Sequence, residues 1–85
     1  MGSKSGNDIL LLNGYVCTDS VGELCVYTDL VAGGLDIIYH PNPNPELDAV
    51  YYVCGKSGNS RIFPIADVEE AIHHSRFLSE LYNTA

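Results

Sequence analysis

Large aromatic residues recur at a fixed interval along the middle of the chain. Tyr15, Tyr27, Tyr39, Tyr51 and Phe63 follow one another at a spacing of twelve residues. The segments around them are rich in the β-branched and aromatic residues that favour strands, and turn-forming residues separate them. A spacing of about 8–12 residues is typical of one short strand plus one turn in antiparallel structure. The pattern predicts five strands, near residues 9–18, 24–30, 35–40, 49–54 and 61–65.

Glycine-containing turns divide the first three of these segments. Residues 20–22 and 32–34 each form a candidate three-residue loop with a glycine in third place. Such hairpin loops put the third residue at positive φ, where glycine has no steric penalty. We therefore expect positive φ at Gly22 and Gly34. The third connection contains alternating prolines, which cannot extend a central strand, and the fourth is a plain Gly/Ser/Asn loop.

These loop lengths predict the register of the first two hairpins. Counting back from the loops places Tyr15 opposite Tyr27 and Tyr27 opposite Tyr39. The same count places Cys17 opposite Cys25. Since opposite residues share a face of the sheet, the recurring aromatic residues form a row across the strands.

Both faces of the predicted sheet are apolar. One, called here the aromatic face, carries Leu11, Tyr15, Cys17, Cys25, Tyr27, Ile37, Tyr39, Tyr51, Val53 and Phe63. The other, called the aliphatic face, carries Leu12, Val16, Leu24, Val26, Leu30, Ile38, Val50, Tyr52, Cys54 and Ile62. A sheet with one wet face shows polar residues there, so each face of this sheet needs a cover.

The C-terminal segment has the period of a single helix. Asp67 and Glu70 have the spacing of a helix N-cap followed by an acid that reaches back to it, and the helix should end near Leu81 or Tyr82. At about 100° per residue one apolar stripe forms, which we expect to pack on the aliphatic face. The stripe comprises Val68, Ala71, Ile72, Ser75, Leu78 and Tyr82. Phe77 and Leu81 fall on the opposite side of the helix.

These elements predict an α+β fold, namely a five-strand antiparallel β-meander with one C-terminal α-helix on one face. The meander could remain open or curl into a partly open barrel. With 85 residues the chain holds one domain, which we place at residues 8–85. Residues 1–7 are polar and are interpreted as a flexible tail or an expression scar.

The charge and cysteine content narrow the partners and the compartment. Eleven acidic and four basic residues give a net charge of −7, which disfavours nucleic acid and anionic membranes because both attract Lys and Arg. An acidic surface could instead meet a basic protein. The chain shows no export signal and no apolar run long enough to span a membrane. Its three cysteines are an odd number, so we expect reduced thiols in a cytoplasmic protein.

Motifs for catalysis, metals or cofactors are weak. His73 and His74 are adjacent, so on a helix they point about 100° apart and grip one ion poorly. Cys25 and His40 fall on opposite faces of the predicted sheet, which argues against a nucleophile–base pair. Residues 55–58 lack the full phosphate-loop pattern and lead into a strand. We expect no catalytic residues, no bound metal and no cofactor.

The unpaired apolar surfaces lead to an expected function. We expect a non-enzymatic protein-interaction module that forms a homodimer, and which is similar in kind to the small acidic products of phages and mobile elements. Its interface would use either the aromatic row, which we favour, or the outer side of the helix. The candidate partner-binding residues are Tyr15, Tyr27, Tyr39, Tyr51, Phe77, Leu81 and His74. The alternative is a small-ligand-binding protein or small enzyme with a Tyr-lined cavity and His40 at its mouth.

Overall fold

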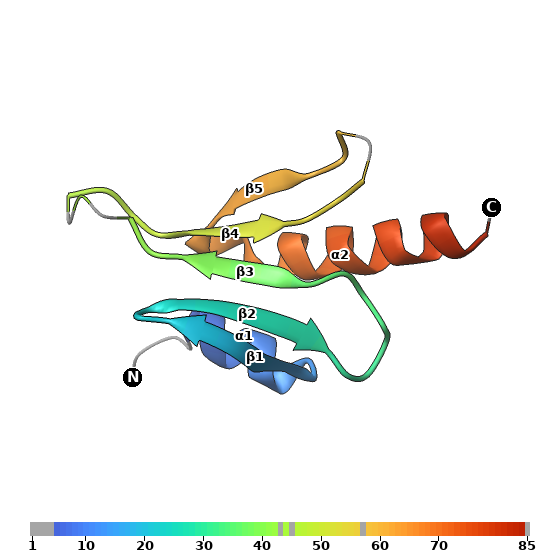
Figure 1. Ribbon diagram of the computed structural model, residues 1–85, viewed down its shortest axis with the longest axis horizontal. Helices are drawn as coiled ribbons and strands as arrows, with labels where there is room; N and C mark the ends of the chain where they lie inside the picture. The colour runs from blue at the N-terminus through green and yellow to red at the C-terminus, as the bar shows by residue number, and fades with distance from the viewer. Residues whose placement is uncertain (1–4, 43, 45, 57, 85) are drawn as a thin grey trace.

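Five antiparallel strands and two α-helices form the part of the chain that the computed structural model describes, residues 5–42, 44, 46–56 and 58–84 (Figure 1). In chain order the elements are α1 (Gly6–Leu12), β1 (Tyr15–Val21), β2 (Leu24–Asp29), β3 (Ile37–His40), β4 (Val50–Val53), β5 (Arg61–Pro64), a 3-10 turn (Ile65–Asp67) and α2 (Val68–Asn83).

The sheet is a meander in which each strand pairs with the next one in sequence. Its order is β1-β2-β3-β4-β5, and all four pairings are antiparallel. β1 and β5 are the two edges, so the sheet does not close into a barrel. The α+β class, the meander and the C-terminal helix are confirmed.

The first predicted strand is wrong in its N-terminal half, because residues 6–12 form helix α1. The Ser5 side chain accepts a hydrogen bond from the backbone N–H of Asp8 at 3.2 Å and so caps the helix. Consecutive leucines lack the alternation of a strand and have high helix propensity. Gly14, at φ 89°, then redirects the chain into β1. Helix α1 begins within the segment interpreted as a tail, and residues 1–4 lie outside the described part.

The predicted register of the first two hairpins is also wrong. Cys17 lies opposite Tyr27, not opposite Cys25, and Tyr15 lies opposite Asp29. The turn is shorter than expected, since Val21 pairs with Leu24, and a bulge lies between Cys17 and Asp19. In the second pair Tyr27 faces Ile37 and Cys25 faces Tyr39. At each of these tyrosines the shift is two residues, so their side chains keep the predicted face.

The glycine at positive φ in the second loop is Gly33, not Gly34. Gly22 and Gly33 have φ values of 61° and 69°, and a Cβ on either would meet nothing within 4 Å. Gly34 is needed for a different reason, because its Cβ would lie 2.6 Å from the Ser75 Oγ and 2.9 Å from the Asp29 Oδ2. The close approach of this loop to helix α2 leaves no room for a side chain there.

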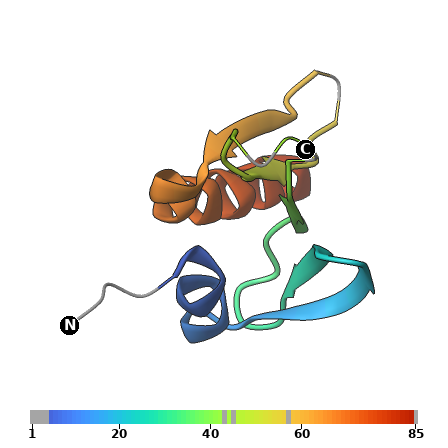
Figure 2. The same ribbon diagram turned by 90° about the vertical axis from the view of Figure 1, so that its left-hand side faces the viewer.

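The prediction that the C-terminal helix packs on the aliphatic face is wrong, because the helix lies on the other side of the sheet. Figure 2 shows α1 and α2 on the same side of the strands. That side is the aromatic face, because the buried core joins Tyr15, Tyr27, Tyr51 and Phe63 with residues of both helices. The aromatic rings bury large areas, and the hydroxyls of Tyr15 and Tyr51 find partners on the helices. The aliphatic face has no helix over it in the described part of the chain.

Helix α2 itself matches the predicted bounds and stripe. Its buried residues are Val68, Ala71, Ile72, Ser75 and Leu78. Asp67 precedes the helix without a side-chain capping bond, because a 3-10 turn joins β5 to α2. Phe77 and Leu81 are exposed, as expected from their place on the opposite side.

Candidate functional site

The structure separates the predicted partner-binding residues into two groups. The side chains of Tyr15, Tyr27 and Tyr51 are buried beneath the helices, and Tyr39 is half-buried beside Tyr51 with ring centroids 5.6 Å apart. These rings form part of the core of one chain and offer little surface to a partner. The second group, Phe77, Leu81 and His74, lies on α2.

Phe77 and Leu81 lie on the outer side of α2, with 52% and 47% of their surface exposed. His74 is half-buried, stacks near Phe63 at a centroid distance of 5.6 Å, and lies 3.2 Å from the Asn59 carbonyl oxygen. His74 thus holds the β4–β5 loop against the helix, whereas the other two side chains face outward.

A continuous apolar row crosses the uncovered side of the sheet. Val26 pairs with Ile38, Ile38 with Tyr52, and Tyr52 with Ile62. These four residues, the central row, come from four successive strands and point away from the helices. Ile62 is the most exposed of them, at 61%. Leu24, His40, Val50 and Pro64 lie on the same side one pleat away.

The central row is also free of charge. Strands β2 to β5 contribute no Asp, Glu, Lys or Arg to this side of the sheet. On β1 and β2, the hydroxyls of Thr18 and Thr28 pair with each other at 2.8 Å. Asp19, opposite Val26, lies at the β1 edge. The face therefore has an apolar centre and a polar rim, which is how docking surfaces are built.

Sequence reasoning placed the central row on this face, as the structure does, but also placed Leu12 there, which lies on α1, and it expected α2 to cover the face. Ser75 lies in the buried stripe of α2. Its Oγ lies 3.0 Å from the Tyr15 hydroxyl and donates to the Leu35 carbonyl oxygen at 2.5 Å. A buried serine needs polar partners, but both faces carry a tyrosine hydroxyl, that of Tyr15 or that of Tyr52, so the sequence did not decide between them.

A buried ion pair fastens the β2–β3 loop to α2. The Arg76 Nε donates to the Asp29 Oδ2 at 2.9 Å, and the Asp29 side chain is fully buried. The same carboxylate accepts from the backbone amides of Val31, Ala32 and Gly34, each at 3.0 Å.

The ion pair is saturated with hydrogen bonds and so serves the structure of the loop. Burial would raise the pKa of Asp29, but the hydrogen bonds from Arg76 and three backbone amides outweigh it and hold that pKa well below its ordinary value. The Asp29 hydrogen bond likewise raises the pKa of Arg76. A carboxylate held ionised by four donors is poorly suited to act as a general base.

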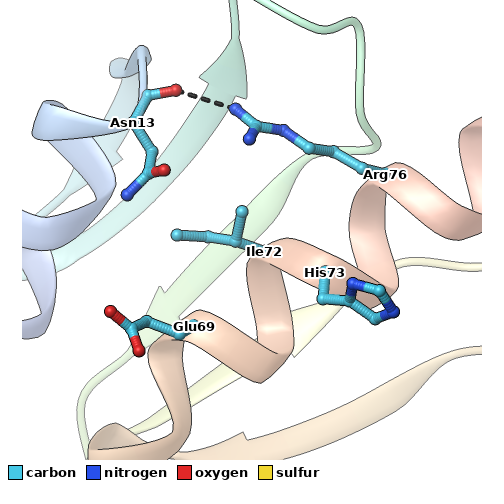
Figure 3. A pocket seen from close by; sticks show the side chains of 5 residues that line it. All are labelled: Asn13, Glu69, Ile72, His73 and Arg76. Atoms are coloured by element: carbon cyan, nitrogen blue, oxygen red, sulfur yellow. Dashed lines mark hydrogen bonds between the residues drawn. The ribbon is translucent and has the colours of Figure 1, made fainter.

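A hollow of about 300 Å³ lies between the end of α1 and helix α2 (Figure 3). Asn13, Glu69, Ile72, His73 and Arg76 line it. Arg76 reaches across to donate to the Asn13 carbonyl oxygen at 2.8 Å. In Figure 3 the side chains of Glu69 and His73 point apart, so the hollow does not bring an acid and a base together.

His40 and the buried tyrosines, which the alternative interpretation placed around one cavity, lie on opposite sides of the sheet. His40 is exposed beside Leu24 at a shallow cleft, on the opposite side of the sheet from the buried tyrosines. His73 and His74 lie on α2, away from His40. Cys17, Cys25 and Cys54 are free thiols, and the neighbouring Cys17 thiol together with burial raises the pKa of Cys25.

Within residues 5–42, 44, 46–56 and 58–84, no group of three or more His, Cys, Asp or Glu side chains is placed to hold a metal ion. Over the same described residues, neither helix combines the length and the apolar character that crossing a bilayer requires.

Comparison of the sequence with protein-family models and with curated proteins, and of the fold with solved structures, finds no match.

Proposed function

We propose that the protein is a non-enzymatic protein-interaction module that forms a homodimer by packing together the aliphatic faces of two copies. The observation that carries the proposal is the uncharged central row, Val26, Ile38, Tyr52 and Ile62, on a side of the sheet that no described helix covers. Ile62 is exposed and the other three are half-buried, so the row is a contiguous apolar surface that solvent reaches. Large apolar patches open to solvent are rare on monomers and mark interaction sites.

The size of the face supports this proposal. Strands lie about 4.8 Å apart and rise about 3.3 Å per residue, so five strands of this length present on the order of several hundred Å². A standard interface buries about 800 Å² of accessible surface per partner, and the accessible surface of side chains exceeds the flat area of the sheet that carries them. Two such sheets packed face to face would lie about 10 Å apart with their side chains interdigitated, as in a β-sandwich.

The absence of charge at the centre of this face allows a second copy to be the occupant. Two chains of net charge −7 repel each other over most orientations. The central part of the aliphatic face is where two copies can approach without bringing carboxylates together, since its strand positions on β2–β5 carry no charge. A two-fold axis through this face would pair the same apolar patch with itself.

Both edges of the sheet disfavour the competing route, in which strands pair edge to edge. β1 carries a bulge between Cys17 and Asp19, which interrupts its regular edge. β5 carries Arg61 and Pro64, and proline has no N–H to donate. Bulges, charges and prolines are the usual protection of edge strands, so association through the face is favoured.

Sedimentation at micromolar concentration tests the proposal. We expect a dimer for the unaltered chain and a monomer for Ile62→Asp, because a two-fold interface contains each substitution twice. The dissociation constant should rise by about 100-fold or more, on the order of tenfold for each buried carboxylate. Ile62 is exposed within one chain, so the fold should survive, which circular dichroism would verify.

Phe77→Asp is the matched control. It introduces the same charge at a similarly exposed apolar residue, but on α2, away from the aliphatic face. The dimer should persist in this variant. A monomer for the unaltered chain at tens of micromolar, or a dimer that Phe77→Asp dissociates and Ile62→Asp does not, would refute the proposal.

A further inference from the structure

Helix α2 presents a second apolar surface on the side opposite its buried stripe. At about 100° per residue, Phe77 lies nearly half a turn from the fully buried Ser75 and Val68. Leu81 follows one turn later on the same side, and both side chains are about half exposed. The outer ridge of α2 is defined here as Glu70, His73, Phe77, Glu80, Leu81 and Thr84.

The structure holds this part of α2 rigidly from the inner side. The Ser79 Oγ donates to the Gly33 carbonyl oxygen at 2.7 Å, and the Tyr82 hydroxyl accepts from the Lys56 backbone N–H at 2.7 Å. Leu78, between them, is buried. In Figure 1 the last turns of α2 extend beyond the ends of the strands. Two loops therefore fasten the projecting end of α2. Because this end is already ordered, binding of a partner loses little free energy to the entropy of ordering it.

The charge of the outer ridge is acidic. Its acidic residues are Glu70 near one end and Glu80 beside Phe77 and Leu81. Arg76 is the one Arg or Lys of α2, and its guanidinium is bound to Asp29. Phe77, Glu80, Leu81 and Thr84 also border a shallow hollow of about 330 Å³. A partner side chain could enter this hollow next to the Glu80 carboxylate.

We propose that the outer ridge of α2 docks against an amphipathic helix of a partner protein whose apolar stripe is flanked by Lys or Arg. Apolar residues at i and i+4 on a preformed helix form a ridge against which a partner helix can pack. Glu80 between the two anchors and Glu70 near one end of the ridge select basic flanks and repel acidic ones. The ridge lies on the opposite layer from the aliphatic face, so this interaction does not depend on the proposed dimer.

A pair of synthetic helical peptides tests the ridge. Each carries a stripe of Leu, flanked by Lys in one peptide and by Glu in the other. Titration of the ¹⁵N-labelled chain at physiological salt should show binding of the Lys peptide, with amide shifts concentrated at residues 70–84. The Glu peptide should bind at least about tenfold more weakly, because like charges then meet at the rim.

Three variants locate the contact. Phe77→Ala should weaken binding of the Lys peptide by about tenfold or more, as expected for a central anchor. Glu80→Lys should weaken the Lys peptide and strengthen the Glu peptide. Glu46→Lys makes the same charge change at an exposed residue of the β3–β4 connection and should leave both affinities unchanged.

Several results would overturn the proposal: no binding of the Lys peptide, equal binding of both peptides, no effect of Phe77→Ala, or amide shifts on the aliphatic face instead of α2. The dispersion of each variant's spectrum shows whether it is folded. The outcome is separable from that of the dimer, because a monomeric chain would still carry the ridge and a dimeric chain need not bind the peptide.

Discussion

Asp29 and Gly34 show how single residues attach a loop to the rest of this fold. Asp29 ends β2 with its carboxylate facing inward, where it accepts from three amides of the following loop and from Arg76. Gly34 lets that loop approach Ser75, because any side chain there would overlap it. Neither role is visible in a hydrophobic pattern, since Arg76, which pairs with Asp29, and Ser75, which Gly34 approaches, lie more than 40 residues away in α2.

The first prediction concerns Asp29→Asn. The substitution leaves Arg76 without its ion-pair partner and replaces one acceptor oxygen of Asp29 by an NH2 group. The free energy of unfolding at pH 7 should therefore fall by about 2–3 kcal/mol. Urea denaturation measures this. Asp36→Asn, at an exposed carboxylate of the same loop, should change stability by less than about 0.5 kcal/mol.

The pH dependence of this difference follows from the lowered pKa of Asp29. The folded chain binds this proton less readily than the unfolded chain, whose carboxyl has a pKa of about 3.9. The contribution is therefore complete above that value and is lost as the pH falls toward the lower folded pKa. The gap between the unaltered chain and Asp29→Asn should narrow on acidification below about pH 5. A constant gap down to about pH 2 would contradict the assignment.

At the scale of elements, α1 is the part of the fold that differs most from the sequence prediction. It packs across the aromatic face, where Gly6 allows the Tyr51 ring to approach closely and the Asn7 side chain accepts from the Tyr51 hydroxyl at 2.7 Å. Its leucines differ in burial: Leu10 is fully buried, whereas Leu12 is 68% exposed. A strand at the same place would have put both on one face.

The second prediction uses this contrast. Leu10→Ala should lower the free energy of unfolding by about 2–4 kcal/mol, because it removes buried methyl groups and leaves a cavity. Leu12→Ala should change it by no more than about 0.5 kcal/mol. Thermal or urea melts of both variants compare the two. Similar losses for both leucines would favour a strand over the helix.

At the scale of the whole molecule, the aromatic residues hold the two layers together. Tyr15, Tyr27 and Tyr51 lie between the sheet and the helices, and burial raises the pKa of each of them. For a tyrosine this favours the neutral form in the folded state. Stability from this source is present below the unfolded pKa of about 10 and is lost as the pH rises toward the higher folded values.

The third prediction is therefore cooperative alkaline unfolding. Above about pH 10, part of the tyrosinate absorbance should appear together with the loss of the far-ultraviolet circular dichroism signal. Tyr15→Phe should reduce the amplitude of that shared step, since one of the three buried hydroxyls is absent. Complete tyrosinate absorbance before any change in circular dichroism would show that these hydroxyls are accessible in the folded chain.

The local sequence pattern determined the elements from β2 onward. The twelve-residue spacing of aromatic residues marked β2 to β5 and the C-terminal half of the first predicted strand, and the period of α2 identified its buried stripe and the exposed Phe77 and Leu81. These features depend on neighbours within one strand or a few helical turns. The composition of the candidate docking surfaces could be predicted for the same reason.

Tertiary contacts decided the remainder. The face of the sheet on which α1 packs rests on its contacts with Tyr51, whose ring lies against Gly6 and whose hydroxyl donates to Asn7. The two faces of the sheet are about equally apolar in sequence, so α2 could have covered either. The choice rests on contacts such as that between the Tyr15 hydroxyl and Ser75, which are 60 residues apart in sequence. With α2 on this face the aromatic residues are buried, and the central row is left without a described helix over it.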